Sequence, residues 1–122
     1  MKTTSREIDQ ALPLTPTVFH ILLALADQER HGYGIRQEVM AMTQNRVQMG
    51  PGTLYGSIKR MVKAQLIQES DERPDPELDD ERRRYYRLTD WGRRVLLAET
   101  ERLSALVQVA QAKQAFGSAE VV

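Results

Sequence analysis

The chain has 122 residues, of which 41% are hydrophobic and 28% are charged, and it contains no cysteine. This length suits one domain, and the composition is that of an ordinary globular protein without disulfides or thiolate metal sites. No apolar run approaches the roughly 20 residues that a membrane-spanning helix needs, and residues 1–11 are too polar for a signal peptide, so we expect a cytoplasmic protein without membrane contact.

Charge is segregated along the chain, although the formal net charge is zero. Residues 44–68 contain four basic residues and no acid, whereas residues 69–81 contain eight acids and one arginine. Four more arginines follow within residues 82–87. A neutral chain can therefore present a strongly positive local surface.

Two amphipathic helices are predicted before the basic segment. The first follows Thr15, which can act as N-cap, with Pro16 as the first helical residue, and it should end between residues 27 and 30. The second is predicted from Tyr33 to Thr43, with His31 capping or packing at its entrance. Both place apolar residues on one side at helical spacing: Val18, Ile21, Leu22 and Leu25 in the first, and Ile35, Val39, Met40 and Met42 in the second.

The stretch MGPGTLYGSIKRM, residues 49–61, predicts a third helix over residues 52–64. Gly50 and Gly52 on either side of Pro51 indicate a sharp turn at its start. The apolar residues Leu54, Ile58, Met61 and Val62 should face the core. The other side should carry or be flanked by Thr53, Tyr55, Ser57, Lys59, Arg60 and Lys63.

A β-hairpin and a long helix complete the predicted elements. LIQES and RYYRLT read as short strands, and the segment DERPDPELDDE between them, with two prolines and seven acids, should form a mobile loop. Tyr85 and Tyr86 alternate, so one should be core and the other surface. Thr89 can cap the last helix, which should continue towards Phe116 and stop at Gly117.

The predicted order is mainly α with a small β-hairpin. Two helices joined by a short turn, the second presenting basic and hydroxyl side chains, are what a helix-turn-helix DNA reader requires. Phosphates on both walls of the major groove attract Lys59, Arg60 and Lys63, whereas an acid on that face would be repelled. We therefore expect double-stranded DNA as a partner.

The last helix is too long for the preceding elements to cover. Leu96, Leu103 and Ala110 are spaced by sevens, with Leu106 and Val107 between them, which suits lengthwise packing against another helix. Left in water, the stripe would be an exposed apolar patch. A second copy of the chain is the expected cover, to which residues 1–11 can add an arm, and docking of a different protein is the alternative.

Four motifs follow one another along the chain. They are HGYGI at residues 31–35, GPGTLYGSIKRM at 50–61, LI at 66–67 and RRRYYRLTDWG at 82–92. In this order they resemble the signatures of the PadR family of winged-helix transcription regulators, over most of the chain from Thr15 to about Leu97. The resemblance implies a homodimeric, usually repressive regulator with a winged helix-turn-helix over residues 1–90 and a C-terminal dimerisation helix over residues 91–122.

The resemblance also implies roles for individual residues. Helix 52–64 would enter the major groove, and the hairpin would be the wing, with a basic base and an acidic tip that phosphate repels. Relatives respond to small, often aromatic molecules, and a pocket at the dimer interface near Trp91 or Phe19 could hold such an effector. The implied DNA-binding residues are Thr53, Tyr55, Ser57, Lys59, Arg60, Lys63, Arg82, Arg83 and Arg84, and the expected dimerisation residues are Leu96, Leu103, Leu106, Val107 and Ala110.

Simpler explanations exist for several of these features. The cations of helix 52–64 could form a solvated face, Tyr55 could shield the core, and residues 82–84 could pair with neighbouring acids. An enzyme is disfavoured, because no cysteine, paired base or glycine-rich phosphate loop is present. Two distant histidines do not make a metal site, and no cofactor is expected. The alternative function is a winged-helix protein-interaction module without DNA binding.

Overall fold

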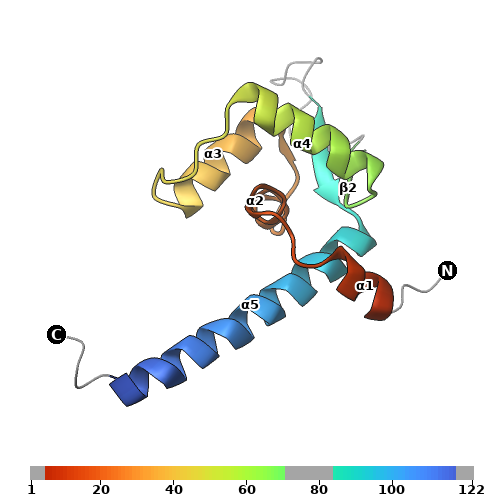
Figure 1. The fold of residues 1–122 in the computed structure, drawn as a ribbon. Coiled ribbons are helices and arrows are strands. Elements are labelled where there is room, and N and C mark those ends of the chain that lie inside the picture. The colour runs from red at the N-terminus through yellow and green to blue at the C-terminus, as the bar shows by residue number, and fades with distance from the viewer. Residues whose placement is uncertain (1–4, 71–83, 118–122) are drawn as a thin grey trace.

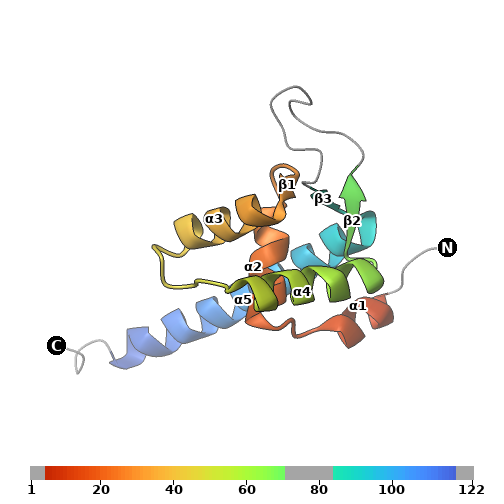
Figure 2. The same cartoon turned by 90° about the horizontal axis from the view of Figure 1, so that it is seen from above.

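The computed structural model describes residues 5–70 and 84–117. Helices α2, α3 and α4 gather beside a small sheet, while α5 runs out of this cluster as one long helix (Figures 1 and 2). The mainly α fold with a small antiparallel sheet that the sequence predicts is confirmed. The helices are α1 (Ser5–Ala11), α2 (Pro16–Ala24), α3 (Gly32–Met42), α4 (Pro51–Lys63) and α5 (Asp90–Gly117), and the strands are β1 (Arg30–His31), β2 (Ile67–Ser70) and β3 (Tyr85–Leu88).

The starts of α2 and α3 follow from their capping residues. Thr15 Oγ1 accepts a hydrogen bond from the amide of Val18 at 3.3 Å, and a proline occupies the first turn of α2. His31 Nδ1 accepts from the amide of Gly34 at 3.0 Å, which makes His31 the N-cap of α3. Both caps satisfy amides that a first helical turn leaves without partners, as the sequence predicts.

Strand β1 is an element that the sequence did not reveal. It pairs antiparallel with β3, with Arg30 opposite Tyr86, and gives a three-stranded sheet in the order β1-β3-β2. Arg30 Nε donates to the carbonyl of Ala24 at 2.8 Å and so caps α2 there, earlier than the end predicted between residues 27 and 30. A two-residue strand is too short for an alternating pattern, which is why it was missed.

Strands β2 and β3 form the predicted hairpin, with Ile67 opposite Leu88 and Ser70 opposite Tyr85. Tyr85 is buried, whereas Tyr86 is partly buried and packs against the core, so the expected division into one core and one surface tyrosine holds only in part. The predicted acidic loop, residues 71–81, lies outside the described residues.

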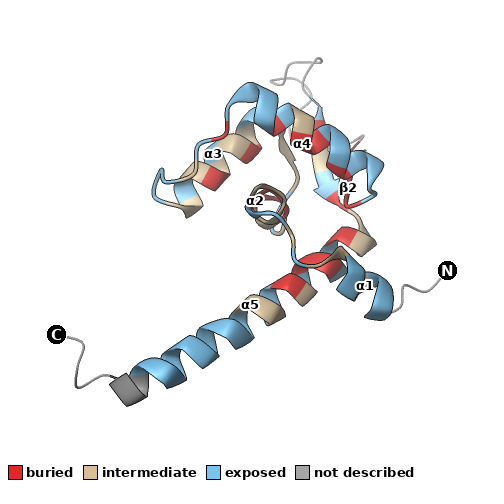
Figure 3. Ribbon diagram, in the orientation of Figure 1, coloured by how far each residue is buried: buried red, intermediate tan, exposed pale blue. Residues whose placement is uncertain are grey.

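The core lies between the inner faces of α2, α3 and α4, the sheet and the first turns of α5 (Figure 3). Within each helix the core residues recur every three or four positions, so each helix contributes one buried stripe. Beyond its first turns, α5 is exposed. The central residues are Ile21, Leu22, Leu25, Ile35, Val39, Leu54, Ile58, Met61, Ile67, Leu88, Val95 and Leu96.

The start of α5 is fastened to the turn between α4 and β2. Thr89 Oγ1 accepts from the amide of Gly92 at 2.9 Å, which confirms Thr89 as the cap. Its amide in turn donates to the carbonyl of Leu66 at 3.2 Å. A Cβ built on Gly92 would lie 1.9 Å from that same carbonyl oxygen, so only glycine fits here.

A buried carboxylate joins α5 to the N-terminal part of the chain. Glu99 is 1% exposed and accepts hydrogen bonds from the Leu14 amide, at 2.7 Å, and from Arg102 Nε. The Arg102 hydrogen bond lowers the pKa of Glu99; burial opposes this change, and the Leu14 amide reinforces it. Because the pKa is lowered, the ionised carboxylate stabilises the fold, and that stabilisation is lost as the pH falls through this pKa.

Candidate nucleic-acid interface

Helix α4 lies at the edge of the helix cluster with one face in the core and one face free (Figure 3). Leu54, Ile58 and Met61 are at most 3% exposed and face inward. The outer face is polar and basic. It carries the exposed residues Thr53, Tyr55, Lys59, Arg60 and Lys63, which are five of the six side chains predicted for this helix.

Ser57 is the exception and corrects the predicted face. It is 3% exposed, because about 100° of rotation per residue places it between Thr53 and the inward-facing Met61. Its Oγ accepts a hydrogen bond from Arg60 Nη2 at 3.2 Å. Ser57 therefore orients Arg60 from beneath and is not available to DNA. The same rotation exposes Val62, which is 39% exposed where the sequence placed it in the core.

The cations of α4 keep their charge unneutralised. Lys59, Arg60 and Lys63 make no ion pair with any acid in the described part of the chain. The sequence has no acidic residue from 39 to 68, which covers the turn before α4 and all of α4. A positive surface with no competing carboxylate is what attraction of phosphate requires.

The glycines at the start of α4 do not act as the sequence predicted. Within the described residues no glycine has a positive φ, and Gly50 is extended at φ −69°. The left-handed residues of the preceding turn are Gln44 and Asn45, with φ of 51° and 62°. A Cβ built on Gly50 or Gly52 would meet nothing within 4 Å, so the start of α4 is open to close approach from outside.

Tyr55 combines packing with exposure. A Cβ built on Gly32 would lie 2.6 Å from its ring, so the ring covers the start of α3, yet Tyr55 is 52% exposed. The hydroxyl lies beside the same glycine, 2.8 Å from the built Cβ, so Tyr55 shields the start of α3 while about half of its surface stays exposed. Its contact with DNA stays a prediction.

The base of the wing is described only at Arg84. Its side chain is 71% exposed, and Nη1 lies 3.8 Å from a carboxylate oxygen of Glu69 on β2. Such an exposed pair contributes about 0 to 1 kcal/mol, so it does not hold Arg84 away from another anion. Arg82 and Arg83 lie outside the described residues, and their predicted role stays a prediction.

The outer part of α5 carries an apolar stripe. Leu106 and Val107 are 52% and 54% exposed, Ala110 is exposed and Leu103 is partly buried. Leu96 does not belong to the stripe, because it is 7% exposed and packs in the core at the start of α5.

Two further apolar residues on α5, Leu97 and Val109, are 59% and 49% exposed and were not predicted as part of an interface. No charged residue occurs between Arg102 and Lys113. An uncharged, exposed segment of this length is typical of a surface that another molecule covers.

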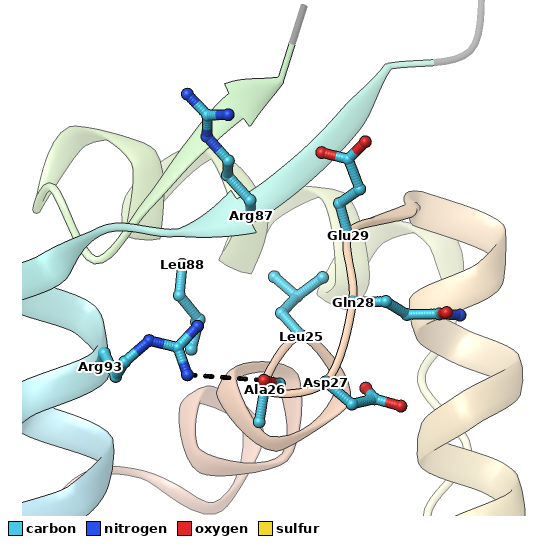
Figure 4. A pocket seen from close by; sticks show the side chains of 8 residues that line it. All are labelled: Leu25, Ala26, Asp27, Gln28, Glu29, Arg87, Leu88 and Arg93. Atoms are coloured by element: carbon cyan, nitrogen blue, oxygen red, sulfur yellow. Dashed lines mark hydrogen bonds between the residues drawn. The ribbon is translucent and has the colours of Figure 1, made fainter. Parts of the chain in front are cut away.

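Described residues of β2, β3 and the start of α5 line parts of the following two pockets. The first has a volume of about 250 Å³. It is lined by residues 25–29 after α2, by the end of β3 and by Arg93 of α5, which donates to the carbonyl of Ala26 (Figure 4). Trp91 lines the other, of about 410 Å³, at the end of α4. Phe19 lines neither. The expected effector site near Trp91 stays a prediction.

Residues 5–70 and 84–117 include both histidines of the chain and no cysteine. No group of three or more metal-ligating side chains occurs among them. None of the helices described there is both long enough and apolar enough to span a bilayer.

These elements define a winged helix-turn-helix protein with an extended C-terminal helix. Residues 21–98 match the profile of the transcriptional regulator PadR-like family. The chain therefore belongs to the PadR-like family of transcriptional regulators, as its motifs predict. Members of this family are DNA-binding regulators and not enzymes, which confirms the prediction that the chain is not an enzyme.

The chain is also similar to individual proteins. An uncharacterized 37.1 kDa protein in transposon TN4556 of Streptomyces fradiae is 34% identical over 86 residues; the match covers 70% of this chain but only 22% of that longer protein. A PadR family transcription regulator from Clostridium difficile R20291 has a TM-score of 0.65 at 23% identity, over 80% of this chain and 97% of that one. A transcriptional regulator from Clostridium thermocellum has a TM-score of 0.63 at 22% identity, over 91% and 97%. At these identities the two structures show a shared fold.

Proposed function

We propose that the chain represses transcription as a homodimer that binds a palindromic operator in the cytoplasm. In each copy α4 enters the major groove and presents Thr53, Tyr55, Lys59, Arg60 and Lys63. The wing base, residues 82–84, contacts the flanking backbone. The observation that carries the proposal is the outer face of α4, where three cations that form no ion pair with any described residue lie in a segment without any acid.

The proposed dimer rests on the apolar stripe of α5. At about 100° per residue, Leu103, Leu106, Val107 and Ala110 continue the line of residues that the core buries at the start of the helix. One face of α5 is therefore buried in the core at the start of the helix, and its apolar continuation further along the helix is exposed. A second copy of α5 covers this stretch, so residues 91–122 serve dimerisation and residues 1–90 serve DNA binding.

Selection from a random duplex library is the direct test of the proposed function. The unsubstituted chain should retain, at moderate salt, fragments with two inverted half-sites about 34 to 36 Å apart or a multiple of that distance. Affinity for the retained sequence should fall steeply as salt rises, because bound phosphates release counterions on binding. Retention of no duplex would favour the alternative, a winged-helix module that binds protein.

Replacing Leu106 by glutamate should separate the copies. A carboxylate without a partner in an apolar contact costs several kcal/mol, so the dimer should weaken by about 100-fold or more. Analytical ultracentrifugation should show twice the chain mass for the unsubstituted protein and the single mass for the variant. Gln108→Glu, an exposed change on the opposite side of α5, is the matched control and should stay dimeric. A single-chain mass for the unsubstituted protein would contradict the dimer.

A further inference from the structure

Arg36 reaches from α3 to the start of α4. Its Nε donates a hydrogen bond to the carbonyl of Met49 at 2.9 Å. Met49 is 4% exposed and directly precedes Gly50, the N-cap of α4. The guanidinium is therefore held beside the first residues of the proposed reading helix, where α3 and α4 lie next to each other (Figure 2).

The charge of Arg36 has no acidic partner within the described residues. Arg30 provides the contrast, because its guanidinium lies within 3.5 Å of carboxylates of both Asp27 and Glu38. One of the five guanidinium N–H groups of Arg36 donates to Met49, and the four on the Nη atoms have no hydrogen-bond partner among the described residues. A guanidinium that the fold already orients loses little freedom when it binds an anion.

The start of α4 next to this hydrogen bond is open, and Arg36 is itself only partly buried. A Cβ placed on Gly50 or Gly52 would meet no protein atom within 4 Å, and no acid occurs from residue 39 to 68. We propose that the Nη groups of Arg36 bind a backbone phosphate at the edge of the groove that α4 enters. The inference rests on the proposed function and adds a DNA contact from α3 that no motif of the sequence indicated.

Two substitutions separate the charge of Arg36 from its bond to Met49. Arg36→Gln keeps an N–H donor for the carbonyl and removes the charge, whereas Arg36→Lys keeps the charge. Arg93→Gln is the matched control, because Arg93 also donates to a backbone carbonyl, that of Ala26 at 3.5 Å, but between α5 and α2 (Figure 4). Binding of each variant to the selected duplex should be followed by fluorescence anisotropy across a salt series.

Arg36→Gln should bind about tenfold more weakly at low salt, and its plot of log affinity against log salt should be less steep by about 0.9. Arg36→Lys should keep the slope of the unsubstituted chain, and Arg93→Gln should keep both affinity and slope. Unchanged binding by Arg36→Gln, or weaker binding with an unchanged slope, would overturn the phosphate contact while leaving the proposed function intact. Failure of the unsubstituted chain to bind any duplex would overturn both.

Discussion

Replacing Lys59, Arg60 and Lys63 together by alanine is expected to abolish operator binding at physiological salt. The three side chains project from the outer face of α4 and carry no ion pair in the described structure, so their charge is fully available to phosphate. Removing each cation should cost about tenfold in affinity, or about 1,000-fold for all three together. The slope of log affinity against log salt should flatten by about 0.9 for each phosphate that is no longer neutralised.

The fold should survive this triple substitution. Alanine is the best helix former, and all three positions are exposed, so α4 should remain helical. Circular dichroism and sedimentation should match those of the unsubstituted chain. The matched control replaces the exposed Arg94 and Lys113 on α5, which should lower affinity far less. Normal binding by the triple variant would show that DNA meets another surface.

Gly92→Ala is expected to destabilise the fold by about 3 kcal/mol, because the new methyl group has no room. The methyl group would lie 1.9 Å from the carbonyl oxygen of Leu66. This oxygen belongs to the backbone, which cannot change rotamer to relieve the clash as a flexible side chain can. Either α5 or the turn between α4 and β2 must shift. Since Thr89 hydrogen bonds to the same carbonyl, the shift would also disturb the cap of α5.

Urea unfolding followed by circular dichroism would measure this loss of stability. Gly52→Ala is the matched control, because a Cβ there meets nothing within 4 Å and alanine favours a helix. The control should leave the free energy of unfolding unchanged or slightly raised. Equal stability of the two variants would mean that the start of α5 accommodates the methyl group.

Local signals predicted the helices well. Thr15 and Thr89 hydrogen bond to the first amides of their helices, and His31 caps α3, because a cap depends on residues only a few positions apart. The third helix was placed within a residue of its observed bounds for the same reason.

Errors arose where a residue sits near the boundary of a helical face or depends on distant partners. Ser57 and Val62 flank the buried stripe of α4, and the polarity of each side chain suggested the wrong side. Leu96 fits a heptad pattern, but the core reaches one turn further along α5 than spacing alone indicates. α1, predicted only as an arm, has no buried residue to mark it as a helix.

Long-range polar contacts left no trace in the sequence. The bond between Glu99 and Leu14 joins residues 85 positions apart, and the bond between Arg36 and Met49 crosses a turn of irregular backbone. Neither pair has a characteristic spacing. A glutamate within the apolar seam of α5, between Leu96 and Leu103, was the one available hint of a buried carboxylate.

Helix α5 has 28 residues and so extends about 42 Å. Between Gly92 and Gly117 it contains neither glycine nor proline, the residues at which helices usually kink. Two copies joined along such a straight segment would keep their groove-reading ends at a constant distance. Inserting one base pair between the half-sites would move them apart by about 3.4 Å and turn them by about 35° about the DNA axis. Because α5 has no residue at which it would readily kink, the dimer could not adjust to this new spacing.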